Sequence, residues 1–285
     1  MELERYLKER FAPSTVKRYL RELHLFFSTS TGNPKMATYQ AIMAHIGRLR
    51  KAQKDVVPAL HAIKAYHAYL VATGQRKDNP AKAIRLRDKK SRDIQLQELF
   101  SQKELERLLE RKERYPILKN RNKFIISLLI YQALTNGDIK DLELKDIDLQ
   151  ERTAYVKGSR KTNSRTLKLQ EQQLVWLKDY LENDRQSLLK GKKNPSKLFL
   201  TKLGTAENGE GIGYLLETCR HLFPNRRLNA KTIRQSVIAN LLQEGKDLRL
   251  VQAFAGHKYP STTERYRQGH VEALRSAIKK HHPLG

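Results

Sequence analysis

A nearly all-charged stretch, Arg85 to Asp93, constrains the fold of this chain more than any other feature of its sequence. The stretch carries no apolar stripe that could pack against a core, so we interpret it as a linker. The chain has 285 residues and 39% hydrophobic content, which is enough to build two cores. We therefore predict two domains, residues 1–88 and 98–285, joined by a linker over residues 89–97.

Apolar residues recur at helical spacing before the linker. Steps of three and four residues predict amphipathic helices over 13–27, 39–49 and 56–71, separated by segments that contain Gly32, Asn33 and Pro34. Ser14 and Thr15 are suited to cap the first of these helices. The first ninety residues are therefore expected to form a small all-helical bundle.

The pattern changes after the linker. Ser101 and Glu104 have the spacing of a capping box, and residues 124–133 are apolar on most sides, which predicts a buried central helix. Two short β-prone runs, 153–156 and 166–169, flank a basic loop that contains glycine, so we expect a β-hairpin or a three-stranded sheet. Helical stripes return over 170–181, 215–222, 232–242 and 248–254, and Gly245 and Gly256 are expected to end the last two. The predicted fold class is mainly α with a small β-sheet in the second domain.

The charge balance indicates a polyanionic partner. Lys and Arg total 56 against 30 Asp and Glu, which gives a formal net charge of +26. Basic residues run the whole length of the chain, and no segment approaches about 18 consecutive apolar residues. We therefore expect a nucleic acid as the partner, with no membrane and no small-molecule substrate. The first ten residues are charged rather than signal-like, which favours a cytoplasmic location.

Cys219 is the only cysteine, which excludes an internal disulfide and a cysteine-rich zinc cluster. Its neighbours Leu215, Leu216 and Leu222 predict that it packs in the core. Because His281 and His282 are adjacent, they would face apart on a helix, which argues against a metal site in the tail.

A set of polar residues near the C-terminus has the spacing of a phosphate-binding site. Lys231 and Arg234 are three apart, so on one helix they point the same way and can hold one phosphate, although surface pairs of this kind are common. Gly256-His257 and Thr262-Thr263-Glu-Arg-Tyr266 follow. His257 comes 23 residues after Arg234 (257 − 234), and Tyr266 comes nine after His257 (266 − 257).

This order and spacing resemble the C-terminal signature of the tyrosine recombinase or phage integrase family. The resemblance implies that Tyr266 attacks a DNA phosphodiester and forms a 3′-phosphotyrosyl intermediate with a free 5′-hydroxyl, without any metal or nucleotide cofactor. A tyrosine hydroxyl that attacks an anion needs nearby cations, and an arginine such as Arg234 can give a phosphate two parallel hydrogen bonds. His257 and Lys231 would add further donors.

The resemblance also implies a lysine general acid in the loop between the two predicted strands, which protonates the leaving 5′-oxygen. Lys161 is our choice for this role. Lys157 and Arg160 are close rivals because the loop length varies, and all three could instead be charges that only contact phosphates.

One residue departs from the family pattern. Thr135 aligns with the family's first catalytic arginine, whereas Asp138 aligns with the acidic residue that orients the arginines. We hypothesise that Arg160 or Arg165 supplies the missing cation, because the tyrosine, lysine, second arginine and histidine are all retained.

The first domain resembles the family's core-binding domain, a SAM-like helical bundle, through Ser14-Thr15-x-x-x-Tyr19 and Asn79-Pro80. The second resembles the α+β catalytic domain, so the likeness covers nearly the whole chain. The two domains would clamp double-stranded DNA mainly through its phosphates. The residues expected to contact DNA in the first domain are Lys17, Arg21, Arg48, Lys51 and Lys64.

Three functions are consistent with the sequence. The first is a site-specific recombinase or integrase that acts as a tetramer on two sites. The second is a catalytically weakened or silent DNA-binding relative, which Thr135 favours, and the third is a topoisomerase-like nicking and closing enzyme. An apolar stripe through Val271, Leu274 and Ile278 would dock on a neighbouring subunit or pack on its own domain.

Overall fold

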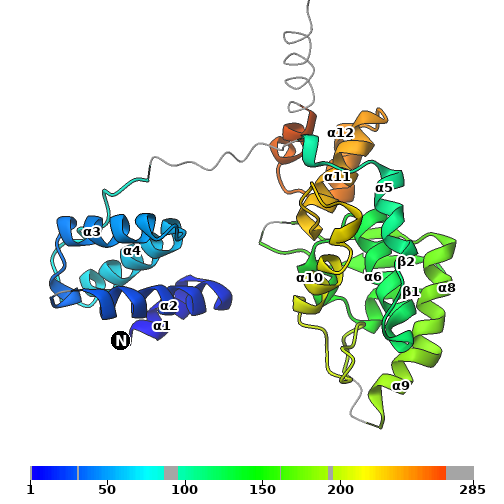
Figure 1. Cartoon of the computed structure of the whole chain (residues 1–285), viewed down its shortest axis with the longest axis horizontal. Helices are drawn as coiled ribbons and strands as arrows, with labels where there is room; N and C mark the ends of the chain where they lie inside the picture. Colours follow the sequence, from blue (N-terminus) through cyan, green and yellow to red (C-terminus); the bar gives the residue numbers. More distant parts are fainter. Residues whose placement is uncertain (1, 31, 87–95, 161, 192–194, 268–285) are drawn as a thin grey trace, which may run out of the picture. The chain divides into compact units, whose positions relative to one another are not determined.

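The computed structural model describes residues 2–30, 32–86, 96–160, 162–191 and 195–267, and the chain divides into two compact units, Met1–Ser91 and Arg92–Gly285 (Figure 1). Residues 87–95 lie outside the described residues. The linker bounds 89–97 and the domain bounds 1–88 and 98–285 therefore stay predictions.

The first unit is an all-helical bundle, as predicted. Its helices are α1 (Leu3–Arg10), α2 (Pro13–Thr29), the 3₁₀ turn η1 (Pro34–Met36), α3 (Tyr39–Lys51) and α4 (Val56–Ala72). Phe26 of α2 and Ile63 of α4 are almost wholly buried in its core. The prediction that Ser14 or Thr15 caps α2 was wrong, because Pro13 takes the first helical position and Ala12 is the N-cap without a side-chain hydrogen bond.

The end of α3 offers a test of local backbone strain. Gln53 adopts a left-handed conformation with φ 54° just after the helix, and its neighbour Lys54 donates a backbone hydrogen bond to the Leu49 carbonyl. Glycine adopts this conformation without the steric cost of a Cβ. We expect Gln53→Gly to stabilise the first unit by about 0.5–1 kcal/mol.

Amide hydrogen exchange of the α3 and α4 residues in the full chain measures this effect. Gly74→Ala is the matched control, because Gly74 has φ 70° after α4 and open space around it. That substitution should destabilise the unit by a similar amount. Equal protection in the wild-type protein and in Gln53→Gly would contradict the prediction.

The second unit is mixed, also as predicted, and holds a three-stranded antiparallel sheet in the order β1-β2-β3. Its α-helices and strands are α5 (Gln102–Glu106), α6 (Lys119–Tyr131), α7 (Asn136–Asp141), β1 (Ile147–Asp148), β2 (Thr153–Val156), β3 (Arg165–Lys168), α8 (Glu171–Asp179), α9 (Arg185–Leu189), α10 (Glu210–Glu217), α11 (Ala230–Gln243) and α12 (Leu248–Ala255). Short 3₁₀ turns and one π-helical turn are η2 (Leu96–Glu98), η3 (Arg107–Glu110), η4 (Pro116–Leu118), η5 (Leu144–Asp146), η6 (Tyr180–Asp184, π) and η7 (Arg220–Leu222). Residues 260–267 are also helical.

The last strand begins one residue earlier than the sequence predicted. Strand β3 starts at Arg165 rather than Thr166, and Arg165 pairs with Val156 of β2. Side chains alternate across a strand, so Arg165 and Leu167 share the buried face of β3. This shift moves Arg165 from the loop into the interior of the unit.

Helix α6 runs through the centre of the second unit and packs against α8 and α11 (Figure 1). The side chains from Phe124 to Ile130 are fully buried, which confirms the predicted buried helix. The capping box of Ser101 and Glu104 is present at α5, and Cys219 is fully buried, both as predicted. None of the described helices is long and apolar enough to cross a membrane.

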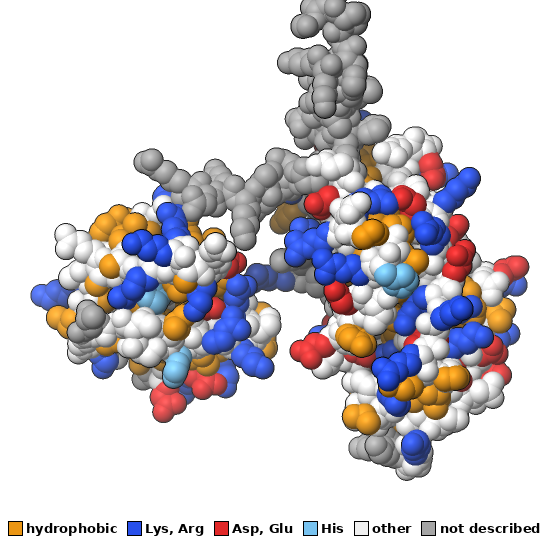
Figure 2. All heavy atoms as spheres, viewed as in Figure 1, with side chains coloured by type: hydrophobic (Ala, Val, Ile, Leu, Met, Phe, Trp, Pro, Cys, Tyr) orange, Lys and Arg blue, Asp and Glu red, His pale blue; other side chains and the backbone are white. Residues whose placement is uncertain are grey.

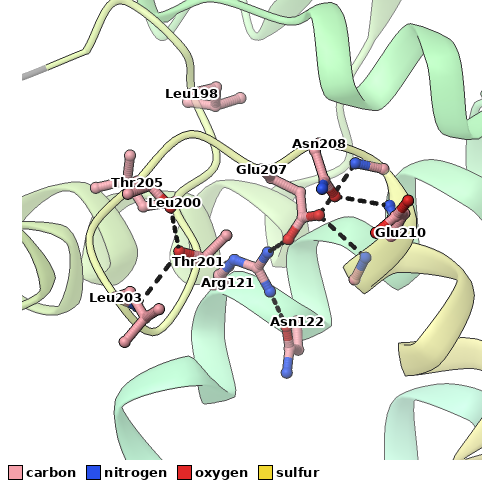
Figure 3. Close-up of polar contacts among 12 residues, drawn as sticks. Arg121, Asn122, Leu198, Leu200, Thr201, Leu203, Thr205, Glu207, Asn208 and Glu210 are labelled. Atoms are coloured by element: carbon pink, nitrogen blue, oxygen red, sulfur yellow. Dashed lines mark hydrogen bonds and ion pairs between the residues drawn. The ribbon is translucent and has the colours of Figure 1, made fainter.

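A buried ion pair connects α6 to the loop before α10. Arg121 donates to the Glu207 carboxylate at 2.5 Å, and both residues are 5% exposed (Figure 3). Glu207 also accepts hydrogen bonds from the backbone N–H groups of Gly209 and Gly211, and Arg121 donates to the Asn122 side chain. This network fixes the path of the loop into α10.

Candidate active site

Arg234 lies in α11, where Asn229 caps the helix one turn before it. The residue is 8% exposed, and its two terminal nitrogens donate to the carbonyls of Ala133 and Ala255, each at 2.5 Å. Ala133 follows α6 with φ 52°, and Ala255 ends α12. The Arg234 guanidinium therefore connects the segment just after α6 with the C-terminal end of α12.

His257 follows Gly256, whose left-handed conformation (φ 68°) ends α12 as predicted. The Nδ1 atom of His257 lies 2.8 Å from the Thr263 hydroxyl, which orients the ring. The backbone N–H of Asn163 donates to the Gly256 carbonyl at 2.8 Å, so the loop before β3 runs beside this corner. If the Thr263 hydroxyl donates to Nδ1, the Nε2–H of a neutral ring is free to donate elsewhere.

Burial, together with the positive charges of Arg234 and Arg165 as smaller causes, lowers the pKa of His257 to about 4. The ring is therefore neutral at pH 7 in the protein without DNA, and it can act there as a hydrogen-bond donor but not as a cation. We expect its Hε1 resonance to titrate with a midpoint near 4 in an NMR titration of the free protein, with the resonance assigned by its loss in His257→Gln. A midpoint near the ordinary value of about 6.5 would contradict this environment.

Tyr266 lies in the helical segment 260–267, with its ring nearly parallel to that of His257 at a centroid distance of 6.2 Å and an interplanar angle of 16°. It packs beside Ile238 of α11 and Val251 of α12 in a small apolar cluster. Burial raises the pKa of the Tyr266 hydroxyl, and the charge of Arg234 partly offsets this effect. The hydroxyl is therefore protonated at neutral pH and close enough to Arg234 to feel its charge.

Thr135 and Asp138 form a capping box at the start of α7. The Thr135 hydroxyl accepts from the Asp138 N–H at 3.1 Å, and the Asp138 carboxylate accepts from the Thr135 N–H at 3.0 Å. The same carboxylate oxygen accepts from Arg165 Nη2 at 3.3 Å. Thr135 thus has a structural role as the N-cap of α7, and its alignment with the family's first arginine stays a prediction.

The two arginines proposed as replacements lie in different surroundings. Arg160 is exposed in the loop after β2, whereas the Arg165 side chain is only 5% exposed. The charge of Arg165 lowers the pKa of Arg234, after burial as the main cause, and it also lowers the pKa of His257. The structure therefore brings Arg165 together with Arg234, His257 and Asp138, and it leaves Arg160 at the surface.

Two of the predicted lysines, Lys157 and Lys231, are exposed at the surface. Lys231 is exposed in the first turn of α11, one turn before Arg234. Lys157 pairs with Glu143 at 3.2 Å and with Asp146 at 3.7 Å, and these carboxylates raise its pKa. An ammonium held in this way is a weaker candidate for the general acid. Lys161, our choice for that role, lies outside the described residues.

The five basic residues predicted to contact DNA in the first unit differ in exposure. Lys17, Arg21, Arg48 and Lys51 are exposed. Arg48 also donates a hydrogen bond to the Thr29 carbonyl at 3.0 Å. Lys64 is half-buried and donates to the Ile84 carbonyl at 2.7 Å. Figure 2 shows Lys and Arg side chains spread over the visible face of each unit.

The sequence of this chain is similar to a known protein family and to individual relatives. The profile of the phage integrase family matches residues 98–272. Tyrosine recombinase XerC of Lactobacillus delbrueckii subsp. bulgaricus is 28% identical over 291 residues, covering 98% of this chain and 96% of that protein. XerC of Natranaerobius thermophilus is 31% identical over 233 residues, covering 79% of this chain and 75% of that protein.

Solved structures share the fold at low sequence identity. A crystal structure of XerH site-specific recombinase bound to difH substrate in a pre-cleavage complex matches with a TM-score of 0.68 and 19% identity, covering 92% of this chain and 79% of that one. A lambda integrase dimer bound to a COC′ core site matches with a TM-score of 0.66 and 15% identity, over 93% and 92% of the two chains.

Fold and sequence together define a tyrosine-type DNA recombinase. The chain belongs to the phage integrase family, because the family profile covers more than half of its length. The predictions of family, fold class and enzyme class are confirmed. The roles of individual side chains stay predictions.

Sequence reasoning missed three supporting groups of this site. It gave no role to Thr263, which contacts the His257 ring, or to the carbonyls of Ala133 and Ala255, which accept from Arg234. The Thr262-Thr263 pair was visible as part of the motif and could have suggested a hydroxyl near His257. No residue type signals a carbonyl acceptor, so those two contacts needed the fold.

Proposed function

We propose that this protein cleaves and rejoins duplex DNA at specific sites through a covalent intermediate on Tyr266. The observation that carries the proposal is that Tyr266, His257 and Arg234 come from three separate segments and still meet at one corner of the second unit. We further propose that the enzyme acts in the cytoplasm as a tetramer on two DNA sites.

The proposed step is a transesterification. The Tyr266 oxygen bonds to phosphorus, the bond from phosphorus to the 5′-oxygen breaks, and a 3′-phosphotyrosyl link and a 5′-hydroxyl result. The phenol releases one proton to water, and Lys161, the proposed donor, gives one proton to the 5′-oxygen. Lys161 then regains a proton from water, so the protons balance. Rejoining is the same attack in reverse, so the reaction needs no external energy source.

Each remaining side chain has an assigned part in this step. Arg234 would donate two hydrogen bonds to the non-bridging oxygens, where negative charge grows in the transition state. His257 would donate through Nε2–H as a neutral ring, and Lys231 would contact the phosphate from the first turn of α11. Asp138 would act as a positioning residue through its contacts with α7 and Arg165.

Binding through many DNA phosphates predicts that the affinity for DNA depends strongly on salt concentration. The net charge of +26 and the exposed Lys17, Arg21 and Lys51 support many phosphate contacts. We expect log K to fall by about 0.9 per unit of log salt concentration for each contact, and Lys51→Gln to reduce that slope by about one contact. Fluorescence anisotropy with a labelled duplex at several salt concentrations measures it. A shallow slope of log K against log salt concentration would contradict binding that is made mainly through phosphates.

Thr135 supports the alternative that this chain is a silent DNA-binding relative. Its hydroxyl caps α7 and provides no positive charge where the family has an arginine. Under this alternative the protein would bind DNA without forming an adduct.

One assay separates the alternatives. Nicked suicide substrates that carry the binding site are incubated with the wild-type protein and with Tyr266→Phe, and covalent adducts are resolved on denaturing gels. An adduct in the wild-type protein alone, with exchange between two sites, supports the proposal. DNA binding without an adduct would favour the silent relative, and relaxation without exchange would favour the topoisomerase-like enzyme.

A further inference from the structure

The Arg165 guanidinium is buried with unused hydrogen-bond donors. Its side chain is 5% exposed, and Nη2 bonds to Asp138. Its Nε and Nη1 atoms are buried and have no hydrogen-bond partner among the described residues. Burying donors without partners is costly, so such a group in a native fold requires an explanation.

The surroundings of these donors are those of the proposed reaction site. A Cβ placed on Gly256 would lie 2.8 Å from Arg165 Nη1, so the guanidinium lies directly against the residue that precedes His257. Arg165 is also close enough to Arg234 and His257 for its charge to affect both. Two guanidinium groups and one imidazole therefore lie near one another at this corner of the second unit.

Arg165, Arg234, Asp138 and His257 together carry one excess positive charge. Arg165 and Arg234 each carry one positive charge, Asp138 carries one negative charge, and His257 is neutral at pH 7. The excess of one positive charge equals the charge of a phosphodiester in magnitude. Without Arg165 the other three groups would carry no net charge, and only the exposed Lys231 and the predicted Lys161 would attract the phosphate.

Asp138 connects Arg165 to Thr135. One oxygen of its carboxylate accepts hydrogen bonds from the Thr135 N–H and from Arg165 Nη2. We propose that Arg165, presented from β3, binds the scissile phosphate in place of the arginine that is absent at Thr135. This inference rests on the proposed function of the site.

The test compares Arg165→Met with Arg152→Met. Arg152 also borders the sheet, but it is exposed at the opposite end of β2 and pairs with Glu171 at the surface. We expect Arg165→Met to lower the rate of adduct formation on a suicide substrate by about a hundredfold or more, and Arg152→Met to change it little. A rate in Arg165→Met close to that of the wild-type protein would overturn the proposal.

A substrate with a methylphosphonate at the scissile position separates charge stabilisation from a structural role. The methyl group removes the negative charge that Arg165 would neutralise. If Arg165 neutralises this charge, Arg165→Met should cleave the methylphosphonate substrate at nearly the rate of the wild-type protein. Equal loss on both substrates would overturn the proposal, because it would show that the variant damages the fold of the site.

Inorganic phosphate provides a readout that does not depend on cleavage. We expect phosphate to raise the melting temperature of the wild-type protein and of Arg152→Met in a saturable way, and to have no such effect on Arg165→Met. Phosphate stabilisation that is unchanged in Arg165→Met would overturn the anion site. If the wild-type protein forms no adduct but its phosphate response requires Arg165, the proposed function fails while the anion site stands.

Discussion

Replacing Arg234 with lysine is expected to lower the rate of DNA cleavage by about a hundredfold to a thousandfold. Lysine keeps the charge but cannot give two parallel hydrogen bonds to a phosphate. It also leaves the carbonyls of Ala133 and Ala255 without the donors that hold them at 2.5 Å. Single-turnover cleavage of a suicide substrate at saturating protein concentration measures the effect separately from binding.

Arg249→Lys is the matched control for this prediction. Arg249 is exposed at the start of α12, so the same chemical change there should leave the cleavage rate nearly unchanged. Near-UV circular dichroism of Arg234→Lys shows whether the site keeps its packing. If Arg234→Lys is folded and cleaves within about threefold of the wild-type rate, the bidentate role of Arg234 is contradicted.

Glu207→Gln should lower the free energy of unfolding of the second unit by about 3–5 kcal/mol. The substitution leaves the Arg121 guanidinium charged and buried, because that residue is only 5% exposed. It also disturbs the carboxylate that accepts from Gly209 and Gly211 at the entry to α10 (Figure 3). Trp176, the only tryptophan, is 9% exposed in this unit, so its fluorescence during urea unfolding reports the loss directly.

The exposed pair of Glu217 and Arg220 supplies the control. These side chains are 60% and 62% exposed and 3.0 Å apart, so Glu217→Gln should cost less than about 1 kcal/mol. The contrast between the two variants tests whether burial, rather than ion pairing as such, makes the Glu207 pair important. Similar costs for both variants would show that the buried network does not hold this unit together.

Local sequence patterns predicted most of the fold. The apolar stripes of α2, α3 and α4 gave their positions closely, since helical spacing and the flanking Gly, Asn and Pro residues are local features. The first turn of α2 was interpreted less well. Ser14 and Thr15 are good capping residues, but Pro13 before them is better suited to the first helical position, so the helix begins there.

The candidate site shows the limit of such reasoning. The order and spacing of Arg234, His257 and Tyr266 were enough to predict that they act together, because a motif of this length is specific. Arg165 was one of two candidates and was assigned to a loop. A strict two-residue alternation from Leu167 would have placed Arg165 on the buried face of β3, as the structure does.

Other parts of the site depend on long-range contacts. The choice between Arg160 and Arg165 required knowing that β3 lies beside Asp138 and Gly256, which are distant in sequence. The partners of Arg234 and the low pKa of His257 follow from burial by several segments at once. No local pattern carries that information.

The chemical identity of a protein–DNA adduct decides whether Tyr266 is the nucleophile. Adduct formed on a suicide substrate would be digested with trypsin and analysed by mass spectrometry, and the released DNA end would be tested for labelling by polynucleotide kinase without phosphatase treatment. We expect a nucleotide attached to Tyr266 through a 3′-phosphate, and a 5′-hydroxyl that the kinase labels without prior phosphatase treatment. An adduct on another residue, or a 5′-phosphate at the released end, would contradict it.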